Sequence, residues 1–253
     1  AAMGAVFASI VYLPSRPVFA SGRVLRLHVI RGVLTAFMML FFFWGLTQLP
    51  LAQAIGLTFV APIIALFLAV PMLGERITPG AKLAAALGFG GVLIIAGEEM
   101  FQVDENSSLL GVAAILIFAL MYAFNLILQR KQALVAKPLE IACYQNVIMT
   151  AVLAIGAPFA LSLPADLVQW SAASAAGLLA VLSLVSLSIA YSRAQAQELV
   201  AVEYTAFIWA ALFGWWFFDE SVGVRTFLGT ALIVCGCLIS SRKQPLRPLS
   251  DTL

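Results

Sequence analysis

The chain has 253 residues, of which 63% are hydrophobic and only 10% are charged. Soluble domains are nearer half apolar and a quarter charged, and a soluble globule of this length has too little interior for so much apolar surface. The net charge of +2 argues against nucleic acid as a partner, and the single histidine, His28, argues against histidine-based metal sites and histidine-dependent catalysis. We therefore expect a membrane protein that is not an enzyme and that needs no cofactor.

Nine apolar segments follow one another along the chain, and they are too long and unbroken for porin-type strands. The first, at residues 1–13, is shorter than the roughly 20 residues that cross a bilayer, so we expect the N-terminus to be truncated. The other eight are expected at residues 29–48, 52–73, 79–96, 109–128, 141–161, 171–191, 199–218 and 225–240. This pattern predicts an all-α polytopic membrane protein.

Positive charge alternates between the predicted loops. If the loop after the first segment is cytoplasmic, 13 of the 14 lysine and arginine residues fall on the cytoplasmic side, and Arg225 alone falls outside. Acidic residues fill the outer loops: Glu98, Glu99, Asp104, Glu105, Asp166, Asp219 and Glu220. This is the bias of the positive-inside rule, and it places the C-terminus in the cytoplasm.

An internal repeat is visible when the chain is shifted by 145 positions. Glu75 then coincides with Glu220, and Gly91 coincides with Gly236. The shift moves five helices along the chain, and an odd number reverses their direction in the membrane, so the halves are predicted to form an inverted repeat with a site near the bilayer midplane. The alternative is that apolar helices resemble each other by chance.

Several motifs resemble the EamA-like drug/metabolite transporter superfamily. They are the run Leu51-Ala-Gln-Ala-Ile-Gly-Leu-Thr-Phe-Val-Ala-Pro62, the turn Leu73-Gly-Glu-Arg76, and Val202-Glu-Tyr-Thr-Ala206 followed by Trp209-Ala-Ala211. The Glu-Tyr-Thr variant is similar to the riboflavin- and S-adenosylmethionine-transporter-like branch. The chain departs from the pattern at Phe207, which stands where the first repeat has Pro62, and at Asp219 in place of Gly74.

The resemblance implies a ten-helix fold of two five-helix inverted repeats, with the first helix missing here so that about nine segments remain. It implies a first repeat at residues 1–97, an acidic external linker at 98–108, a second repeat at 109–241 and a basic cytoplasmic tail at 242–253. It also implies a central cavity, alternating access and a place in the bacterial inner membrane.

Glu203 is the only acidic residue well inside a predicted span. Because an ionisable group is costly there, it is expected to be functional, either binding a proton that drives transport or meeting a cationic part of a substrate. The alternative is a structural carboxylate near the cytoplasmic interface, paired with Arg193.

Other polar and aromatic side chains recur within the spans and are expected to face the bundle interior, because amide and hydroxyl groups need partners in a membrane. They serve either as substrate contacts or as interhelical hydrogen bonds. Pro62 is expected to act as a hinge, or to be a tolerated kink. Besides Glu203, the candidates for substrate binding are Tyr204, Trp209, Trp44, Gln53, Thr58, Tyr122, Asn125, Asn146, Ser186 and Tyr191.

The expected function is secondary active transport of a small polar or aromatic metabolite by alternating access. A channel or a non-transporting membrane subunit is the alternative, and a membrane enzyme is the least favoured because no span holds a second acid. The expected partners are a small-molecule substrate and the lipid bilayer, with proton coupling and a homodimer left open.

Overall fold

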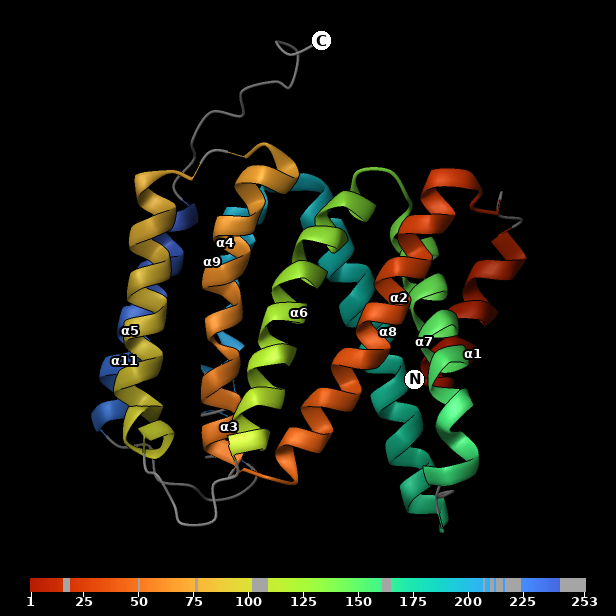
Figure 1. The fold of residues 1–253 in the computed structure, drawn as a ribbon. Helices are drawn as coiled ribbons and strands as arrows, with labels where there is room; N and C mark the ends of the chain where they lie inside the picture. The colour runs from red at the N-terminus through yellow and green to blue at the C-terminus, as the bar shows by residue number, and fades with distance from the viewer. Residues whose placement is uncertain are drawn as a thin grey trace.

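The structure is a computed structural model that describes residues 1–15, 19–49, 51–75, 77–101, 109–160, 165–206, 208–209, 212, 216 and 224–241. All secondary structure within these ranges is helical (Figure 1). The elements are α1 (Ala2–Tyr12), a 3-10 turn (Leu13–Ser15), α2 (Gly22–Leu46), α3 (Leu51–Thr58), α4 (Val60–Leu73), α5 (Pro79–Phe101), α6 (Leu109–Ala133), α7 (Pro138–Ala160), α8 (Leu167–Arg193), α9 (Ala196–Glu203) and α11 (Val224–Ser241). The expected all-helical architecture is thereby confirmed.

Four of the described helices are long and apolar enough to cross a membrane. They lie at Gly22–Leu46, Leu109–Ala133, Pro138–Gly156 and Leu167–Arg193. Shorter apolar helices lie at Ala2–Tyr12, Val60–Leu73, Pro79–Ile94 and Phe227–Gly236. Figure 1 shows these helices running roughly along one common direction, with α5 beside α11 at one edge of the bundle and α1 beside α7 near the other.

Small side chains fill the interior and large apolar side chains cover the outside. Ala61, Ala65, Ala119 and Ala123 are fully buried in one core cluster. Outside, by contrast, Phe227 is 72% exposed. Small residues let helix backbones approach closely, and a surface rich in large apolar side chains suits a surrounding lipid phase.

The helices extend past several of the expected segment ends. Helix α2 begins at Gly22 rather than at 29, and α6 runs to Ala133 rather than to 128. The additional turns contain arginine and lysine residues, and the expected segments ended before them because only apolar stretches were counted as spans. Such side chains are compatible with a helix end in a membrane because their charged heads reach toward the interface.

The expected segment at 52–73 is divided into two helices. Helix α3 ends at Thr58, Phe59 is non-helical, and α4 begins at Val60. The break lies close to Pro62, and the ring of a proline disfavours a continuous helix because it clashes with the carbonyl four residues earlier, here that of Thr58. Pro62 itself is buried in the first turn of α4.

The same division recurs 145 positions later. Helix α9 spans Ala196–Glu203, which is the range of α3 shifted by 145, and it ends at a turn that begins with Tyr204, the counterpart of Phe59. The rings of Phe59 and Tyr204 stack on each other with centroids 5.9 Å apart. The two helix breaks therefore meet inside the molecule.

Helices α5 and α11, which begin 145 positions apart, pack closely through glycines. A Cβ at Gly91 of α5 would lie 2.6 Å from the carbonyl oxygen of Gly229, and a Cβ at Gly236 of α11 would lie 2.9 Å from that of Ala84. Because Gly91 and Ala84 are the counterparts of Gly236 and Gly229, the two contacts are equivalent under the shift of 145.

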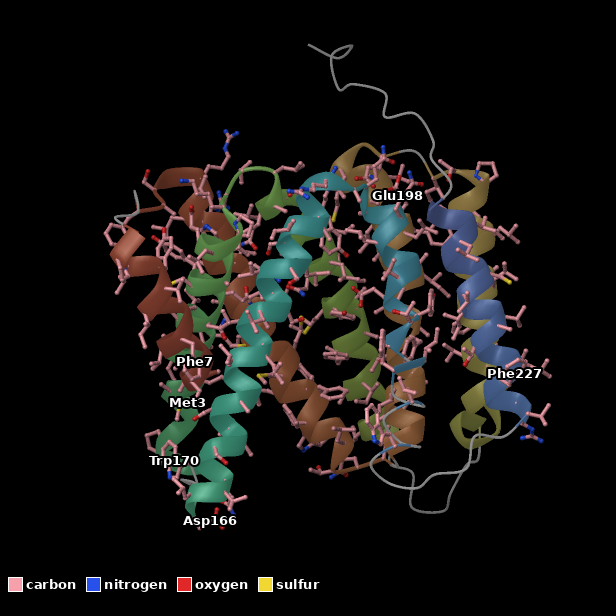
Figure 2. All side chains as sticks on the ribbon, turned by 180° about the vertical axis from the view of Figure 1, so that it is seen from behind. Met3, Phe7, Asp166, Trp170, Glu198 and Phe227 are labelled. Carbon is pink, nitrogen blue, oxygen red and sulfur yellow. The ribbon has the colours of Figure 1, made fainter. Side chains whose placement is uncertain are left out.

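One end of the bundle gathers most of the described cationic residues. Helices α2, α5, α7 and α9 begin there, and α6 and α8 end there (Figure 1). Glu198 labels this end in Figure 2, and Asp166 labels the opposite end. The residues in these helix ends and turns are Arg23, Arg26, Lys82, Arg130, Lys131, Lys137 and Arg193. They belong to the cytoplasmic set inferred from the charge pattern.

Candidate functional site

A carboxylate and a phenol form a direct contact inside the bundle. Tyr122 of α6 donates a hydrogen bond of 2.7 Å to the Oε2 atom of Glu203, the last residue of α9. Arg193, the partner considered from the sequence, is instead exposed at the end of α8. Two of the predicted site residues are therefore in contact, and Glu203 bonds to Tyr122 rather than to Arg193, the partner in the alternative interpretation.

The guanidinium group of Arg31 lies next to this pair in a cradle of side-chain amides. Its Nε donates to Oδ1 of Asn125 at 2.9 Å, Nη1 to Oε1 of Gln132 at 2.8 Å, and Nη2 to Oε1 of Gln129 at 2.7 Å. Arg31 is 2% exposed. Since a guanidinium can only donate, these contacts also fix which end of each amide faces it.

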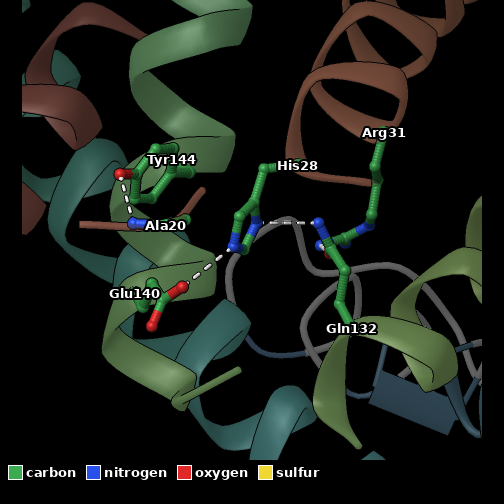
Figure 3. A network of polar contacts seen from close by, with 6 residues as sticks. All are labelled: Ala20, His28, Arg31, Gln132, Glu140 and Tyr144. Carbon is green, nitrogen blue, oxygen red and sulfur yellow. Dashed lines mark hydrogen bonds and ion pairs between the residues drawn. The ribbon is translucent and has the colours of Figure 1, made fainter. Parts of the chain in front are cut away.

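The cradle continues to His28, one helical turn before Arg31 on α2. Nε2 of Gln132 lies 3.0 Å from Nδ1 of His28, and Nε2 of His28 lies 3.1 Å from Oε1 of Glu140 (Figure 3). Because the amide nitrogen can only donate, Nδ1 accepts, and the proton on Nε2 is donated to Glu140. Tyr144 stacks on the imidazole with centroids 4.6 Å apart.

Two further phenols, those of Tyr191 and Tyr204, are fully buried. Tyr191 at the end of α8 interacts electrostatically with Glu203 and Arg31, and its hydroxyl has no hydrogen-bond partner among the described residues. Tyr204 packs on Phe59, and its hydroxyl is also unpaired there. We call Arg31, Tyr122, Asn125, Gln129, Gln132, Tyr191 and Glu203 the polar cluster.

The turn between α4 and α5 is tied to three other helices. Oε1 of Glu75 lies 3.5 Å from Nε of Arg130 and accepts a hydrogen bond of 3.2 Å from the backbone nitrogen of Ala196. Arg130 also donates to the backbone carbonyl of Tyr191. We call this set the Glu75 latch. It links α6, the end of α8 and the start of α9 at the cationic end of the bundle.

The remaining predicted site residues lie elsewhere. Trp44, Trp209 and Ser186 are exposed, and the hydroxyl of Thr58 donates to the carbonyl of Ile55 in its own helix. Asn146 is buried where α7 meets Gly4 of α1. The side chain of Gln53 lies outside the described part of the chain.

A surface groove lies apart from the polar cluster. The groove, of about 650 Å³, runs along α1 and includes no residue of the polar cluster. It is lined by Ala5, Val6, Ser9, Ile10, Leu13 and Pro14. Among the described residues no group of three or more histidine, cysteine or acidic side chains lies where it could hold a metal ion. Neither feature adds to the polar cluster.

Sequence reasoning missed Arg31, Gln129, Gln132 and the latch role of Glu75. From the sequence, Arg31 is only one of the 13 cytoplasmic charges and Glu75 only the repeat counterpart of Glu220, while both glutamines lie beyond the expected end of their segment at 128. A signal was present, because Tyr122, Asn125, Gln129 and Gln132 are spaced by 3, 4 and 3 residues and so share one face of an otherwise apolar helix.

Known proteins with similar sequences are transporters. A riboflavin transporter of Rhizobium johnstonii is 29% identical over 87% of this chain and 71% of its own length. An S-adenosylmethionine uptake transporter of Rickettsia bellii is 26% identical over 95% of this chain and 82% of its own length. Both carry the names of transporters rather than enzymes, in agreement with the expectation from the sequence.

A solved structure and a family model also match this chain. A solved crystal structure superposes with a TM-score of 0.81 at 19% identity, covering 95% of this chain and 85% of that one, and so shares the fold. The model of the EamA-like transporter family matches residues 1–97 and 109–242. This confirms the resemblance inferred from the motifs: the chain belongs to the EamA-like transporter family and is a multi-pass helical membrane protein.

Proposed function

We propose that the chain is a secondary active transporter that moves a small polar or aromatic metabolite across a bacterial inner membrane by alternating access. The observation that carries this proposal is the polar cluster, which places a carboxylate, a guanidinium and two phenols inside a bundle whose core is otherwise mostly alanine, leucine and isoleucine. Ionisable groups at such positions are costly to bury and usually mark a transport pathway. The names of the relatives support a small-molecule substrate.

Two five-helix inverted repeats supply the moving parts in this proposal. Three observations support the repeat. Helix α9 covers the same positions as α3 when the chain is shifted by 145, Phe59 stacks on its counterpart Tyr204, and the glycine contacts between α5 and α11 are equivalent under the same shift. Broken helices that face each other across a repeat interface are the usual location of transporter binding sites. Pro62 and the break at Phe59 then form one hinge, and the turn at Tyr204 forms the other.

Glu203 is the coupling residue in this mechanism. Its ionised carboxylate accepts the hydrogen bond of Tyr122, whereas a protonated carboxyl group can itself donate. Uptake of a proton therefore removes the charge at the bundle centre and changes what Tyr122 can bind. That is the local event which a proton-coupled cycle requires.

The Glu75 latch is the gate at the cationic end, which we assign to the cytoplasm from its charge. It ties the turn after α4, in the first repeat, to the start of α9, in the second. Opening toward that side requires the ion pair of Glu75 with Arg130 to separate.

The test is counterflow in proteoliposomes that contain the full chain, with riboflavin and S-adenosylmethionine among the labelled solutes. A transporter gives saturable uptake that is accelerated by the same unlabelled solute on the other side. Glu203→Gln keeps the shape but cannot ionise, and it is expected to abolish the pH dependence of uptake.

The control is Arg193→Gln, an exposed change at the cationic end of the bundle, which is expected to leave uptake unchanged. Flux that does not saturate and shows no counterflow would favour the channel alternative. Unchanged pH dependence in Glu203→Gln would remove Glu203 from the mechanism.

A further inference from the structure

The only histidine of the chain, His28, is 1% exposed and has a polar partner at each ring nitrogen. Nε2 lies 3.1 Å from Oε1 of Glu140, Nδ1 lies 3.0 Å from Nε2 of Gln132, and the ring of Tyr144 stacks on the imidazole (Figure 3). Histidine is the side chain whose charge ordinarily changes between pH 5 and 8. A buried imidazole that already contacts a carboxylate is therefore positioned to take up a proton.

The charged groups beside His28 act on it in opposite directions. The carboxylate of Glu140 on α7 attracts a positive imidazole, whereas the guanidinium group of Arg31, one helical turn later on α2, repels it. Helix α6 contributes the neutral amide of Gln132, and α1 contributes the phenol of Tyr12, whose ring contacts the ring that is stacked on the imidazole. Because the two charges oppose each other, the contact with the amide influences whether the imidazole is protonated.

Gln132 joins His28 to Arg31 by using both ends of its amide. Its Oε1 accepts from Nη1 of Arg31 at 2.8 Å, and its Nε2 donates to Nδ1 of His28 at 3.0 Å. This arrangement fits a neutral imidazole, since the lone pair of Nδ1 is the acceptor. Both hydrogen bonds connect the end of α6 to α2.

A proton on Nδ1 is incompatible with that arrangement. The protonated imidazole donates from both nitrogens, so Nδ1–H would face the donor Nε2 of Gln132. If the amide turns over, its oxygen accepts from His28, but its NH2 group then faces Nη1 of Arg31, which can also only donate. Protonation therefore breaks one of the two hydrogen bonds between Gln132 and α2, whichever way the amide is turned.

We propose that His28 is a proton-binding site, distinct from Glu203, and that Gln132 couples its protonation to the hydrogen bonding of Arg31. The proton binds to Nδ1, while Nε2–H keeps its bond to Glu140. Because binding costs one hydrogen bond between α2 and α6, acid at the cationic end of the bundle loosens the start of α2 from the end of α6. The inference goes beyond the proposed transport function and does not depend on the role of Glu203.

The test is a pH titration of the full chain in lipid nanodiscs, followed by NMR with 15N-labelled histidine and a purification tag that contains no histidine. One imidazole then reports, because the chain has a single histidine. At high pH the neutral ring should carry its proton on Nε2, and Nδ1 should take up a proton as the pH falls from about 8 to 5. A neutral ring with its proton on Nδ1, or a ring that does not titrate in this range, would overturn the proposal.

Gln132→Glu tests the coupling to Arg31. A carboxylate can accept from Nδ1–H and from Nη1 at once, so the titration midpoint of His28 should rise by about 1 pH unit or more. Gln129→Glu is the matched control, because Gln129 bonds to Nη2 of Arg31 whereas the amide bonded to His28 is that of Gln132. Its rise should be much smaller, and an equal rise in both variants would overturn the coupling through Gln132.

Gln132→Leu gives a second test if Gln132→Glu does not fold. It removes the donor that favours a neutral ring and adds no charge, so the midpoint of His28 should again rise. An unchanged midpoint in this variant would overturn the coupling.

Hydrogen exchange tests the loosening of α2. The parent protein and Gln132→Glu are compared at one pH below the midpoint of the parent, where only the parent has lost a bond between α2 and α6. Amides in the first turns of α2 should exchange about fivefold faster in the parent, as expected for the loss of one buried hydrogen bond. Equal exchange would overturn the loosening. Neither measurement depends on transport, so the site can fail while the transport function stands.

Discussion

Glu75 lies at a turn, yet its side chain is mostly buried because it binds both Arg130 and the start of α9. Its side chain is 11% exposed, and that of Arg130 is 13% exposed. A partly buried ion pair with an additional backbone hydrogen bond is worth more than an exposed pair, since solvent screens it less. The latch therefore holds the turn after α4 against α6 and the start of α9 in this structure.

We predict that Glu75→Gln opens the cationic end more often. The substitution removes the negative charge but keeps an oxygen that can accept from Ala196, so a loss of about 1 kcal/mol in the closed state is expected, equivalent to roughly a fivefold change in population. The readout is the alkylation rate of a cysteine introduced at Gln195, a partly buried position just before α9.

Lys137→Gln is the matched control, because Lys137 is exposed at the same end of the bundle. It should leave the alkylation rate unchanged. Equal rates in Glu75→Gln and in the parent protein would contradict a gating role for the latch.

The sequence allowed part of the candidate site to be predicted at this scale. Glu203 and Tyr122 were both identified, because each is a polar residue in an apolar span and such groups need interior partners. The cradle of Arg31 was not predicted, since it joins residues up to 101 positions apart. Long-range contacts of this kind depend on helix packing, which composition and periodicity do not specify.

Glycines set how closely α5 and α11 approach each other. Gly91 faces the backbone of Gly229, whereas Gly90, its neighbour, has open space around the position of a Cβ. Replacing either glycine by alanine raises the helix propensity by the same amount, about 1 kcal/mol. A difference in stability between the two variants therefore measures the cost of the steric clash at Gly91.

We therefore predict that Gly91→Ala destabilises the protein and that Gly90→Ala does not. The added methyl group at Gly91 would lie 2.6 Å from a backbone carbonyl oxygen, so the helices must separate. Overpacking of this kind costs about 1–3 kcal/mol. The measurement is the Tm of each variant in one detergent, and a Tm for Gly91→Ala at or above that of Gly90→Ala would contradict the packing account.

The described elements follow the expected segments in order, except that residues 52–73 form two helices, and the helix ends were predicted less well. The length of an apolar segment locates a membrane-spanning helix, because a helix needs about 20 apolar residues to cross the hydrocarbon core of a bilayer. It does not locate where the helix stops, because α2 and α6 continue through turns that carry arginine, lysine and glutamine. The division of residues 52–73 into α3 and α4 was signalled by Pro62, which was interpreted as a hinge within one segment.

At the scale of the whole molecule, helices from distant parts of the chain alternate across the bundle. Helices α5 and α11 pack together, α4 packs on α9, and α1 and α2 pack on α7. Figure 1 shows that each side of the bundle contains helices from before and after residue 109. Rocking of one side against the other would therefore involve both proposed repeats, with the polar cluster between them.

We expect equivalent helices of the two proposed repeats to cross the membrane in opposite senses. Lys82 in the first turns of α5 and Val224 at the start of α11 are both exposed and mark equivalent helix starts. Each is replaced by cysteine in a background without Cys143, Cys235 and Cys237, and intact cells are treated with an impermeant maleimide. The account predicts labelling of Val224→Cys in intact cells and of Lys82→Cys only after permeabilisation. Labelling of both from the same face would contradict it.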